Sequence, residues 1–321
     1  MRVVITGASG FVGNGLARHL FANPDALARP ISKLILTDLA GGTDWPAPGS
    51  GDFLEWHRGN LGDPASLDAL LDKPVDLLFH LASVPGSLAE RKPDLGWSTN
   101  LMAPLTLAER LARQGREHGL APRVVFASTI AVYSALGPGP VTEDHPARPA
   151  NSYGAHKLMT EILLADLSRR GEIDARSGRL PGIVARPVAA TGHGSAFMSL
   201  IFHKAKAGEP YVCPVSGSAS AWWMSLKCCL ENLLHAAVLP ARALPPTRTC
   251  QLPVLHAGVE EVLAALADRF GTDATARIRH EPNAAIEEAF GRFPPLATPI
   301  AESLGFRSER SIEELVANAF A

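Results

Sequence analysis

The residues best suited to proton chemistry are Tyr153 and Lys157, which lie four positions apart in the segment YGAHK. If this segment opens a helix, as its surroundings predict, both side chains lie on one face. A tyrosine with an ordinary pKa of about 10 is a poor base near neutral pH, but a neighbouring ammonium stabilises the phenolate and lowers that pKa. Ser128 and Thr129 end a preceding apolar run and add hydroxyl groups for a substrate oxygen. This set predicts proton exchange with an alcohol or carbonyl while a hydride moves.

A glycine-rich turn near the N-terminus, TGASGFVG at residues 6–13, predicts a dinucleotide site. Gly7 allows the tight turn, Gly10 lets the backbone approach a pyrophosphate, and Gly13 lets the helix pack closely on the sheet. The helix N-terminus then offers unpaired N–H groups to the phosphates. Asp38 is expected to end the second strand, where a carboxylate binds the adenosine ribose and repels a 2′-phosphate. The predicted cofactor is therefore NAD.

The elements that must position these residues follow from the apolar pattern. Short apolar runs alternate with longer amphipathic segments, which is typical of a parallel sheet with crossover helices. Strands are expected at residues 2–6, 33–37, 53–57, 76–80, 123–127 and 178–184, and helices at 11–22, 64–71, 95–115 and 152–170. We therefore predict an α/β fold of the Rossmann type, with a doubly wound parallel sheet and a smaller C-terminal lobe.

The second half of the chain is less regular and rich in loops of small residues. Helices are expected at residues 225–238, 259–270 and 311–320, and a strand at 249–254. The predicted NAD-binding Rossmann domain covers residues 1–184 with a return segment at about 225–256. The predicted substrate-binding lobe covers about 185–224 and 257–321.

The composition restricts the class of protein. The 321 residues are 46% hydrophobic and 19% charged, which is ordinary for a globular chain. A net charge of −2 without a long basic run predicts no nucleic-acid or membrane partner. The four cysteines lack metal-ligand spacing, so we expect no metal and a reducing, cytoplasmic location. The expected partner is a small-molecule substrate.

Several segments, taken in order and spacing, resemble the extended short-chain dehydrogenase/reductases, the NAD-dependent epimerase/dehydratase family. They are TGASGFVG (6–13), Asp38, HLAS (80–83), Asn100, FASTIAVY (126–133), YGAHK (153–157) and RLPGIVARP (179–187). The resemblance implies that Tyr153 is the general acid/base and that Lys157 orients the ribose. It also implies that Thr129 is the assisting hydroxyl, with Ser128 beside it, and that Asn100 supports the active site.

The same resemblance implies a set of cofactor contacts. They are Gly7, Ser9, Gly10, Phe11, Val12, Gly13, Asp38, Asn60, Leu61, Leu81, Ala82, Ser83, Tyr153, Lys157, Leu180, Pro181 and Ile183. Asn60 stands where the family usually has an Asp near the adenine. Family members commonly form homodimers by packing two helices from each chain into a four-helix bundle, and the helices at 95–115 and 152–170 are expected to do so here.

Substrate contacts are expected from side chains on both halves of the chain: Ser83, Thr129, Arg186, His193, Trp222 and Trp223. The two tryptophans predict an aromatic wall suited to a bulky neutral carbonyl, because Ser220 stands where many relatives carry an anion-binding Arg. RLPGIVARP and the LLHAA segment at 233–237 instead resemble D-erythronate dehydrogenase-like enzymes, with Arg186 as the partner of a carboxylate. Both substrate classes remain open.

Three functions fit these residues. The first is an NAD-dependent dehydrogenase or reductase acting on a secondary alcohol or ketone. The second is an epimerase of a sugar or nucleotide sugar with tightly bound NAD, which uses the same triad. The third is a non-catalytic NAD-sensing module. Of the histidines, His80 is expected to make a structural hydrogen bond and His156 to face solvent.

Overall fold

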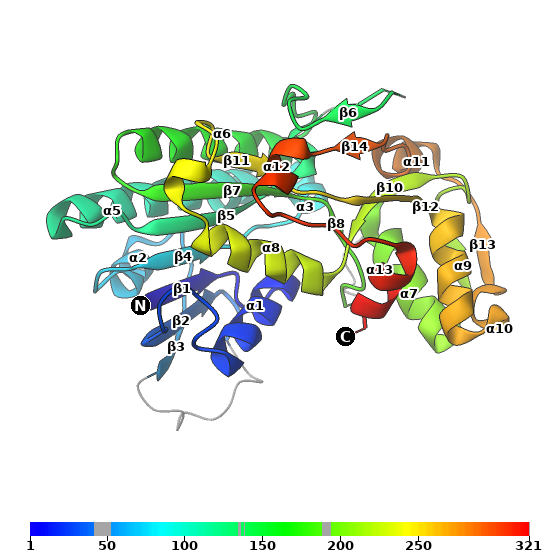
Figure 1. Cartoon of the computed structure of the whole chain (residues 1–321), viewed down its shortest axis with the longest axis horizontal. Helices are drawn as coiled ribbons and strands as arrows, with labels where there is room; N and C mark the ends of the chain where they lie inside the picture. The colour runs from blue at the N-terminus through cyan, green and yellow to red at the C-terminus, as the bar shows by residue number, and fades with distance from the viewer. Residues whose placement is uncertain (42–52, 134–135, 138, 188–193, 321) are drawn as a thin grey trace. The chain divides into compact units, whose positions relative to one another are not determined.

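The computed structural model describes residues 1–41, 53–133, 136–137, 139–187 and 194–320 (Figure 1). The chain divides into two compact units. The first comprises Met1–Val132, Arg148–Arg179 and Leu233–Cys250. The second comprises Tyr133–Ala147, Leu180–Asn232 and Gln251–Ala321.

The first unit is built on a seven-stranded sheet with the order β11-β7-β5-β4-β1-β2-β3. Its strands are β1 (Arg2–Thr6), β2 (Lys33–Asp38), β3 (Leu54–Arg58), β4 (Leu77–His80), β5 (Arg123–Thr129), β7 (Asp174–Leu180) and β11 (Thr249–Gln251). The pairs β1·β2, β1·β4, β2·β3 and β4·β5 are parallel. Because the strand order reverses between β1 and β4, a ligand crevice is expected at their carboxyl ends. The predicted Rossmann fold is confirmed.

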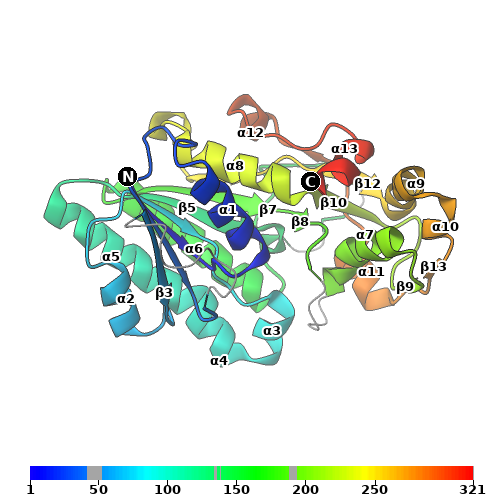
Figure 2. The ribbon, with the colours of Figure 1, turned by 90° about the horizontal axis from the view of Figure 1, so that it is seen from below.

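Helices cover both faces of this sheet (Figure 2). The helical segments of the first unit are α1 (Phe11–Ala22), α2 (Pro64–Leu70), α3 (Gly86–Arg91), α4 (Pro93–Gly96), η2 (Trp97–Met102), α5 (Ala103–His118), η3 (Ile130–Val132), α6 (Ser152–Arg169) and η5 (Ala241–Ala243). Leu67 of α2, Leu107 of α5 and Leu164 of α6 share one buried cluster with Val4 of β1 and Phe126 of β5. The burial of these side chains fixes α6, which carries Tyr153 and Lys157, on the sheet.

The second unit has its own core and three small sheets. Its strands are β6 (Val141–Thr142), β8 (Gly182–Ile183), β9 (Tyr211–Cys213), β10 (Ser220–Met224), β12 (Leu255–Gly258), β13 (Ile278–His280) and β14 (Leu296–Ala297). Its helical segments are η4 (Gly194–Ala196), α7 (Phe197–Ala207), α9 (Val259–Phe270), α10 (Thr272–Thr275), α11 (Ala284–Phe290), α12 (Pro299–Ser303) and α13 (Ile312–Asn318). The helix α8 (Leu226–Val238) begins in the second unit and ends in the first. Phe197, Phe202, Trp223, Val262 and Leu315 belong to one buried cluster of the second unit.

Several expected elements differ from the observed ones. The strand expected at 178–184 is interrupted at Pro181, so β7 joins the large sheet and β8 pairs with β10. The helix expected at 95–115 contains the π-helical segment η2 before α5 begins. The segment 133–147, assigned to the first domain from the sequence, belongs to the second unit because β6 pairs with β14.

Candidate functional site

The glycine turn between β1 and α1 has the close packing that a dinucleotide loop requires. Gly7 has a φ of 69°, and a Cβ there would lie 2.6 Å from the Ala82 nitrogen. A Cβ at Gly13 would lie 2.0 Å from the Gly7 oxygen. A side chain at either position would displace the backbone, so the turn keeps this conformation at the start of α1 only with glycine. Gly10 caps α1, and the N–H groups of Phe11 and Val12 belong to its first turn.

Asp38 ends β2, as predicted, and its carboxylate organises the adjacent loop. Its Oδ2 accepts a hydrogen bond of 3.0 Å from the Ser9 nitrogen, and its Oδ1 accepts one of 3.2 Å from the Ala40 nitrogen. Arg58 stands opposite Asp38 in the β2·β3 register and donates to the Leu39 carbonyl at 3.1 Å. The sequence analysis missed this cation because nineteen residues separate Arg58 from Asp38 along the chain. Asp38 therefore lies beside a positive charge.

The loop after β4 is held from below by Thr6. The Thr6 hydroxyl oxygen accepts from the nitrogens of Leu81 (3.2 Å) and Ala82 (3.3 Å), and it lies 2.9 Å from His80 Nδ1. Since both N–H groups donate to this oxygen, its own proton goes to His80 Nδ1. His80 is fully buried, and burial together with the charge of Lys157 lowers its pKa to about 3. The structural hydrogen bond predicted for His80 is confirmed.

Asn100 fixes the next part of this loop. Its Oδ1 accepts from the Val84 nitrogen at 2.8 Å, and its Nδ2 donates to the Val84 carbonyl at 2.9 Å. The Asn100 side chain is buried on η2, whereas Ser83 beside the clamped residue is exposed. Asn100 thus holds the loop that carries Ser83. Near the predicted adenosine end, Asn60 Oδ1 accepts from the Gly62 nitrogen at 2.9 Å and shapes the turn containing Leu61.

The first turn of α6 lies tightly against the end of β5. Asn151 caps the helix by accepting from the Gly154 nitrogen at 2.8 Å. A Cβ at Gly154 would lie 2.0 Å from the Ala131 oxygen, so only glycine permits this approach. Tyr153 precedes Gly154, and Thr129 ends β5 two residues before Ala131, whose nitrogen donates to the Thr129 hydroxyl oxygen at 3.1 Å. The backbone therefore brings the Tyr153 and Thr129 segments together, as the spacing predicted.

Lys157 lies one turn further along α6 and is buried. Its Nζ donates to the Ala127 carbonyl at 2.7 Å and lies 4.6 Å from the Phe126 ring centre and 5.7 Å from the Tyr153 ring centre. Burial lowers the pKa of Lys157 to about 7, against the opposing effect of the negative charge on Glu161. An ammonium close to a phenol favours the phenolate form of that phenol.

Ser128, predicted beside Thr129, has a buried hydroxyl that donates to Glu161 Oε1. The same carboxylate accepts two hydrogen bonds from Arg179, at 3.1 Å from Nε and 2.8 Å from Nη2. Ser128 therefore acts on Glu161 in this structure. Glu161 and Arg179 were missed by the sequence analysis, although Glu161 follows Lys157 by four residues and thus shares its helix face.

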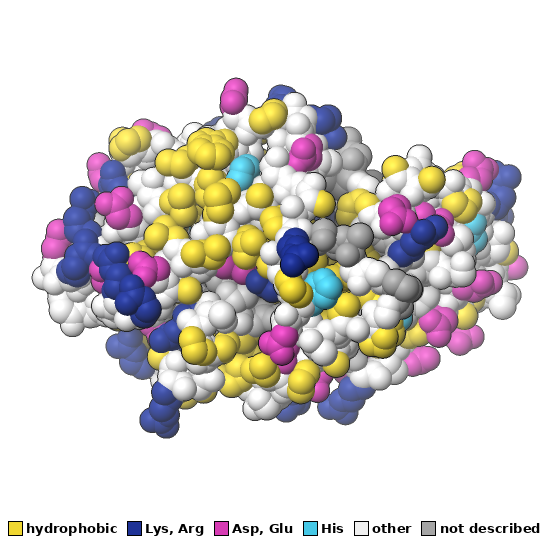
Figure 3. All heavy atoms as spheres, turned by 90° about the horizontal axis from the view of Figure 1, so that it is seen from above, with side chains coloured by type: hydrophobic (Ala, Val, Ile, Leu, Met, Phe, Trp, Pro, Cys, Tyr) yellow, Lys and Arg dark blue, Asp and Glu magenta, His cyan; other side chains and the backbone are white. Residues whose placement is uncertain are grey.

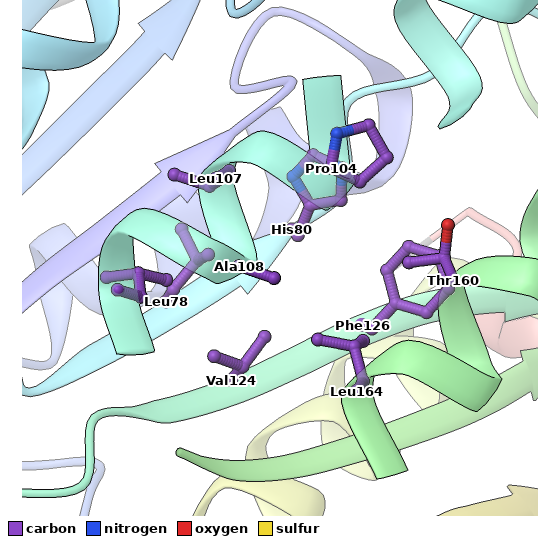
Figure 4. Close-up of a pocket in the computed structure, with 10 residues that line it drawn as sticks. Leu78, His80, Pro104, Leu107, Ala108, Val124, Phe126, Thr160 and Leu164 are labelled. Carbon is purple, nitrogen blue, oxygen red and sulfur yellow. The ribbon is translucent and has the colours of Figure 1, made fainter. Parts of the chain in front are cut away.

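His156 is not solvated, contrary to the prediction. Its ring packs edge-on against Trp97 with centres 5.9 Å apart, and burial lowers its pKa. Figure 4 shows a small cavity in the core of the first unit, lined mainly by apolar residues and by His80 and Thr160. Its volume of about 10 Å³ accommodates at most one water molecule, so it is not a substrate pocket.

The two tryptophans of the second unit are core residues. Trp222 is 1% exposed and Trp223 is 0% exposed. The Trp222 indole N–H donates to the Pro294 carbonyl at 2.7 Å, and that of Trp223 donates to the Ala257 carbonyl at 2.9 Å. The expectation that an indole reaches a substrate pocket is therefore not met, because both rings are enclosed and both N–H groups are satisfied. Ser220 likewise donates to the Phe293 carbonyl at 2.8 Å.

The remaining residues predicted from the second half lie in the second unit. Leu180 ends β7, and Pro181 and Ile183 follow it. Arg186 is exposed and comes after Ala185, whose φ of 55° is unusual for a residue with a Cβ. The Arg186 nitrogen donates to Ser199 Oγ at 3.2 Å. His193 lies outside the described residues.

The described ranges, 1–41, 53–133, 136–137, 139–187 and 194–320, contain neither a metal-ligand cluster nor a membrane-spanning helix. In this part of the chain no three His, Cys, Asp or Glu side chains are grouped to hold a metal ion. No helix there combines the length and the apolar character needed to cross a membrane.

The geometry of the first unit fits a bound dinucleotide. The fit rests on the glycine turn that leaves no room for a Cβ, the start of α1, the Asp38 carboxylate beside the turn, and the buried Lys157 next to Tyr153. Fold and site together define an oxidoreductase of the Rossmann class. In folds of this class a dinucleotide binds at the carboxyl ends of the strands, which here are the ends of β1, β2 and β4.

Comparison with known proteins identifies the family within this class. The model of the NAD dependent epimerase/dehydratase family matches residues 3–227, and the chain belongs to that family. D-erythronate dehydrogenases from Haemophilus influenzae and Cupriavidus necator are 32% and 34% identical to it, over 98% of this chain and 98% and 97% of theirs. A solved nucleoside-diphosphate-sugar epimerase from Agrobacterium tumefaciens is 33% identical with a TM-score of 0.90, covering 98% of this chain and 92% of that one. The chain is an NAD-dependent oxidoreductase of the extended short-chain dehydrogenase/reductase family.

Proposed function

We propose that the enzyme oxidises a secondary hydroxyl of a small sugar acid of the D-erythronate type, with NAD as the oxidant. The observation that carries the proposal is the position of the buried Lys157 ammonium. It donates to the Ala127 carbonyl of β5 and lies 5.7 Å from the centre of the Tyr153 ring. The D-erythronate dehydrogenases that match nearly the whole chain support the substrate class. The enclosed tryptophans remove the main argument for a bulky neutral carbonyl.

The residues of the first unit divide the chemistry among them. NAD held at the glycine turn would supply the acceptor for the hydride that leaves the substrate carbon. Tyr153, as the phenolate, takes the proton of the substrate hydroxyl, so that the O–H bond breaks as the hydride leaves the carbon and the substrate becomes a ketone. The Thr129 hydroxyl hydrogen-bonds the same substrate oxygen, and the Lys157 ammonium stabilises the charge on Tyr153. Ser128 and Asn100 act behind this set through Glu161 and the Val84 backbone.

Further contacts are proposed on the same grounds. Asp38 favours NAD over NADP, with Arg58 as the nearby cation that lessens the discrimination. Leu180, Pro181 and Ile183 are proposed on the nicotinamide side, and Arg186 as the partner of a substrate carboxylate. Ser83 is exposed on the loop held by Asn100, so it remains a candidate for substrate contact.

A homodimer is proposed from the exposed apolar side chains of the two predicted interface helices. Trp97 is 54% exposed, Met102 43%, Met159 41% and Ile162 63%. Figure 3 shows hydrophobic side chains gathered in the region of α5 and α6. A contiguous apolar surface of this kind favours association with another chain, and a four-helix bundle built from these helices would cover it.

The experiment combines a substrate screen with one substitution. Purified enzyme is assayed for NADH formation with aldonates, free sugars and aryl alcohols, using NAD and NADP in parallel. We expect turnover with four-carbon aldonates and NAD. Tyr153→Phe should lower kcat by about 100- to 10,000-fold, because the proton acceptor is lost, while NADH binding is retained. Tyr211→Phe, on β9 of the second unit, is the matched control. Full turnover by Tyr153→Phe would refute the assigned role.

An epimerase is the second candidate, supported by the solved epimerase that is 33% identical. The same tyrosine and lysine serve a reaction in which the hydride returns to the opposite face. Substrate-dependent release of stoichiometric NADH favours the dehydrogenase. Co-purified NAD with no net NADH formation favours the epimerase.

A further inference from the structure

The Glu161 carboxylate connects three elements behind the proposed catalytic pair. Glu161 follows Lys157 by one helical turn on α6 and is 3% exposed. It accepts a hydrogen bond from Ser128 at the end of β5 and two from Arg179 near the end of β7. A two-pronged Arg–carboxylate contact with a third donor fixes both the position and the charge of the carboxylate.

Lys157 needs such a charge. Its ammonium is 2% exposed and donates to one backbone carbonyl, Ala127, at 2.7 Å. Among the ion pairs formed by the described residues, none includes Lys157. An ammonium in this environment loses the stabilisation of water, and burial lowers its pKa to about 7. The negative charge on Glu161 raises the pKa of Lys157 against that effect.

The other groups around Lys157 do not replace Glu161. From β4, His80 is neutral and is itself held neutral by burial and by the charge on Lys157. From β7, Arg179 is positive and is paired with Glu161. On α6, Tyr153 is the other titratable neighbour, and the stretch of β5 from Val124 to Thr129 and the π-helix η2 contain no charged residue. Glu161 is the negative charge that acts on the Lys157 ammonium.

We propose that Glu161 is a positioning residue of the dehydrogenase reaction, which keeps Lys157 in its charged form and fixes α6 against the ends of β5 and β7. The proposal rests on the proposed function, because the charged Lys157 matters through Tyr153. It also gives Ser128 a role, since the Ser128 hydroxyl holds the carboxylate. Glu161 thus acts indirectly, through the charge of Lys157 and through the contacts of α6 with β5 and β7.

The first measurement needs no substrate. Lysine labelled with 13C at Cε is incorporated, the Lys157 signal is assigned with Lys157→Arg, and its titration is followed by NMR in the whole protein without cofactor. Glu161→Gln keeps the size and most hydrogen bonds but removes the charge. We expect Lys157 to titrate at least one pH unit lower, which is a tenfold shift in proton affinity. An unchanged titration in a folded Glu161→Gln variant overturns the proposal.

Two further variants test the direction of the shift in the Lys157 titration and provide a control. Arg179→Gln removes the positive charge that offsets Glu161, so Lys157 should titrate at higher pH, opposite to Glu161→Gln. Ser128→Ala removes a hydrogen bond without changing charge, so the titration should move by less than half as much. If Glu161→Gln does not fold, the Arg179→Gln result decides, because a shift to lower pH contradicts the proposal.

The second measurement uses activity. In Glu161→Gln, kcat/KM should begin to fall at a lower pH on the alkaline side of its profile, because Lys157 loses its proton earlier and neutral Lys157 no longer stabilises the charge on Tyr153. Glu161→Asp retains the charge and should restore the limb. A loss of activity that is equal at every pH indicates a purely structural role and overturns the proposal. Full activity of Tyr153→Phe would instead refute the proposed function while leaving the Lys157 titration intact, so the two failures are distinguishable.

Discussion

Two buried residues in each unit differ in how fully their polar groups are satisfied. In the first, Lys157 is enclosed at the end of β5, and among the described residues no carboxylate is in ion-pair contact with it and His80 Nε2 has no hydrogen-bond partner. In the second, Trp222 and Trp223 are enclosed with both indole N–H groups satisfied by backbone carbonyls. In this comparison the groups that are costly to bury are those to which we assign chemistry, and the well-satisfied large side chains build a core. The burial of Lys157 therefore lowers the stability of the first unit while serving the proposed chemistry.

Replacing the lysine gives the largest expected effect on this comparison. Lys157→Met removes a buried ammonium whose pKa is lowered to about 7, so the folded state binds this proton less well than the unfolded state. That penalty is fully present below pH 7 and declines as the pH rises toward the ordinary lysine value of about 10.4. We expect the free energy of unfolding to rise by roughly 4 kcal/mol at pH 6.5, since the difference of about 3.4 pKa units corresponds to about 1.4 kcal/mol per unit, while activity is lost.

Urea denaturation of the cofactor-free protein at pH 6.5 and pH 9.5 measures this effect. The gain should be smaller at pH 9.5. Lys73→Met, an exposed lysine of the same unit, serves as the control and should change little. A variant that is less stable than the wild type at both pH values would show that Lys157 is a structural asset and not a functional cost.

The fold and the candidate site of the first unit could be predicted because the motifs that form them are short and local in sequence. The glycine turn, Asp38 and the Tyr153–Lys157 pair are each encoded within a few residues, and parallel strands bring their ends together. Arg58 was missed because only the β2·β3 register places it opposite Asp38. Glu161 was missed although its spacing from Lys157 was visible, because its partner Arg179 comes from another strand.

The second unit could not be predicted in the same way. Its strands are short and pair over long sequence distances, as β6 does with β14 and β10 with β12. An apolar run such as Ser220–Met224 reads equally well as a pocket wall or as a core strand. The structure decides for the core strand, because tertiary pairing of β10 with β8 and β12 encloses both tryptophans.

A pair of glycine substitutions gives an intermediate effect and separates backbone strain from cofactor binding. Gly7 and Gly208 both have positive φ, at 69° and 62°. A Cβ at Gly7 meets the Ala82 backbone at 2.6 Å, whereas one at Gly208 meets nothing within 4 Å. We expect Gly7→Ala to weaken NADH binding by about 100-fold, roughly 2.7 kcal/mol, because the turn must move.

Gly208 lies at the C-terminal end of α7 in the second unit. Gly208→Ala should lower the free energy of unfolding by about 1 kcal/mol and leave the affinity for NADH unchanged. Fluorescence titration of NADH measures both variants, and thermal unfolding checks that each is folded. Equal NADH affinity in Gly7→Ala and the wild type would show that the turn does not cradle the dinucleotide.

The smallest expected effect tests the second unit alone. Trp222→Phe removes the hydrogen bond to the Pro294 carbonyl and part of the ring contact with Phe293, whose centre lies 4.9 Å away. A buried carbonyl left without its donor and a smaller ring should together cost about 2 kcal/mol of unfolding free energy. Because the indole is enclosed, kcat and KM should remain within about twofold of the wild type once the protein is folded, a difference below roughly 0.5 kcal/mol. Urea denaturation and steady-state kinetics on one preparation give both numbers. A KM raised several-fold without loss of stability would mean that the indole meets the substrate, and that the second unit opens its core to bind.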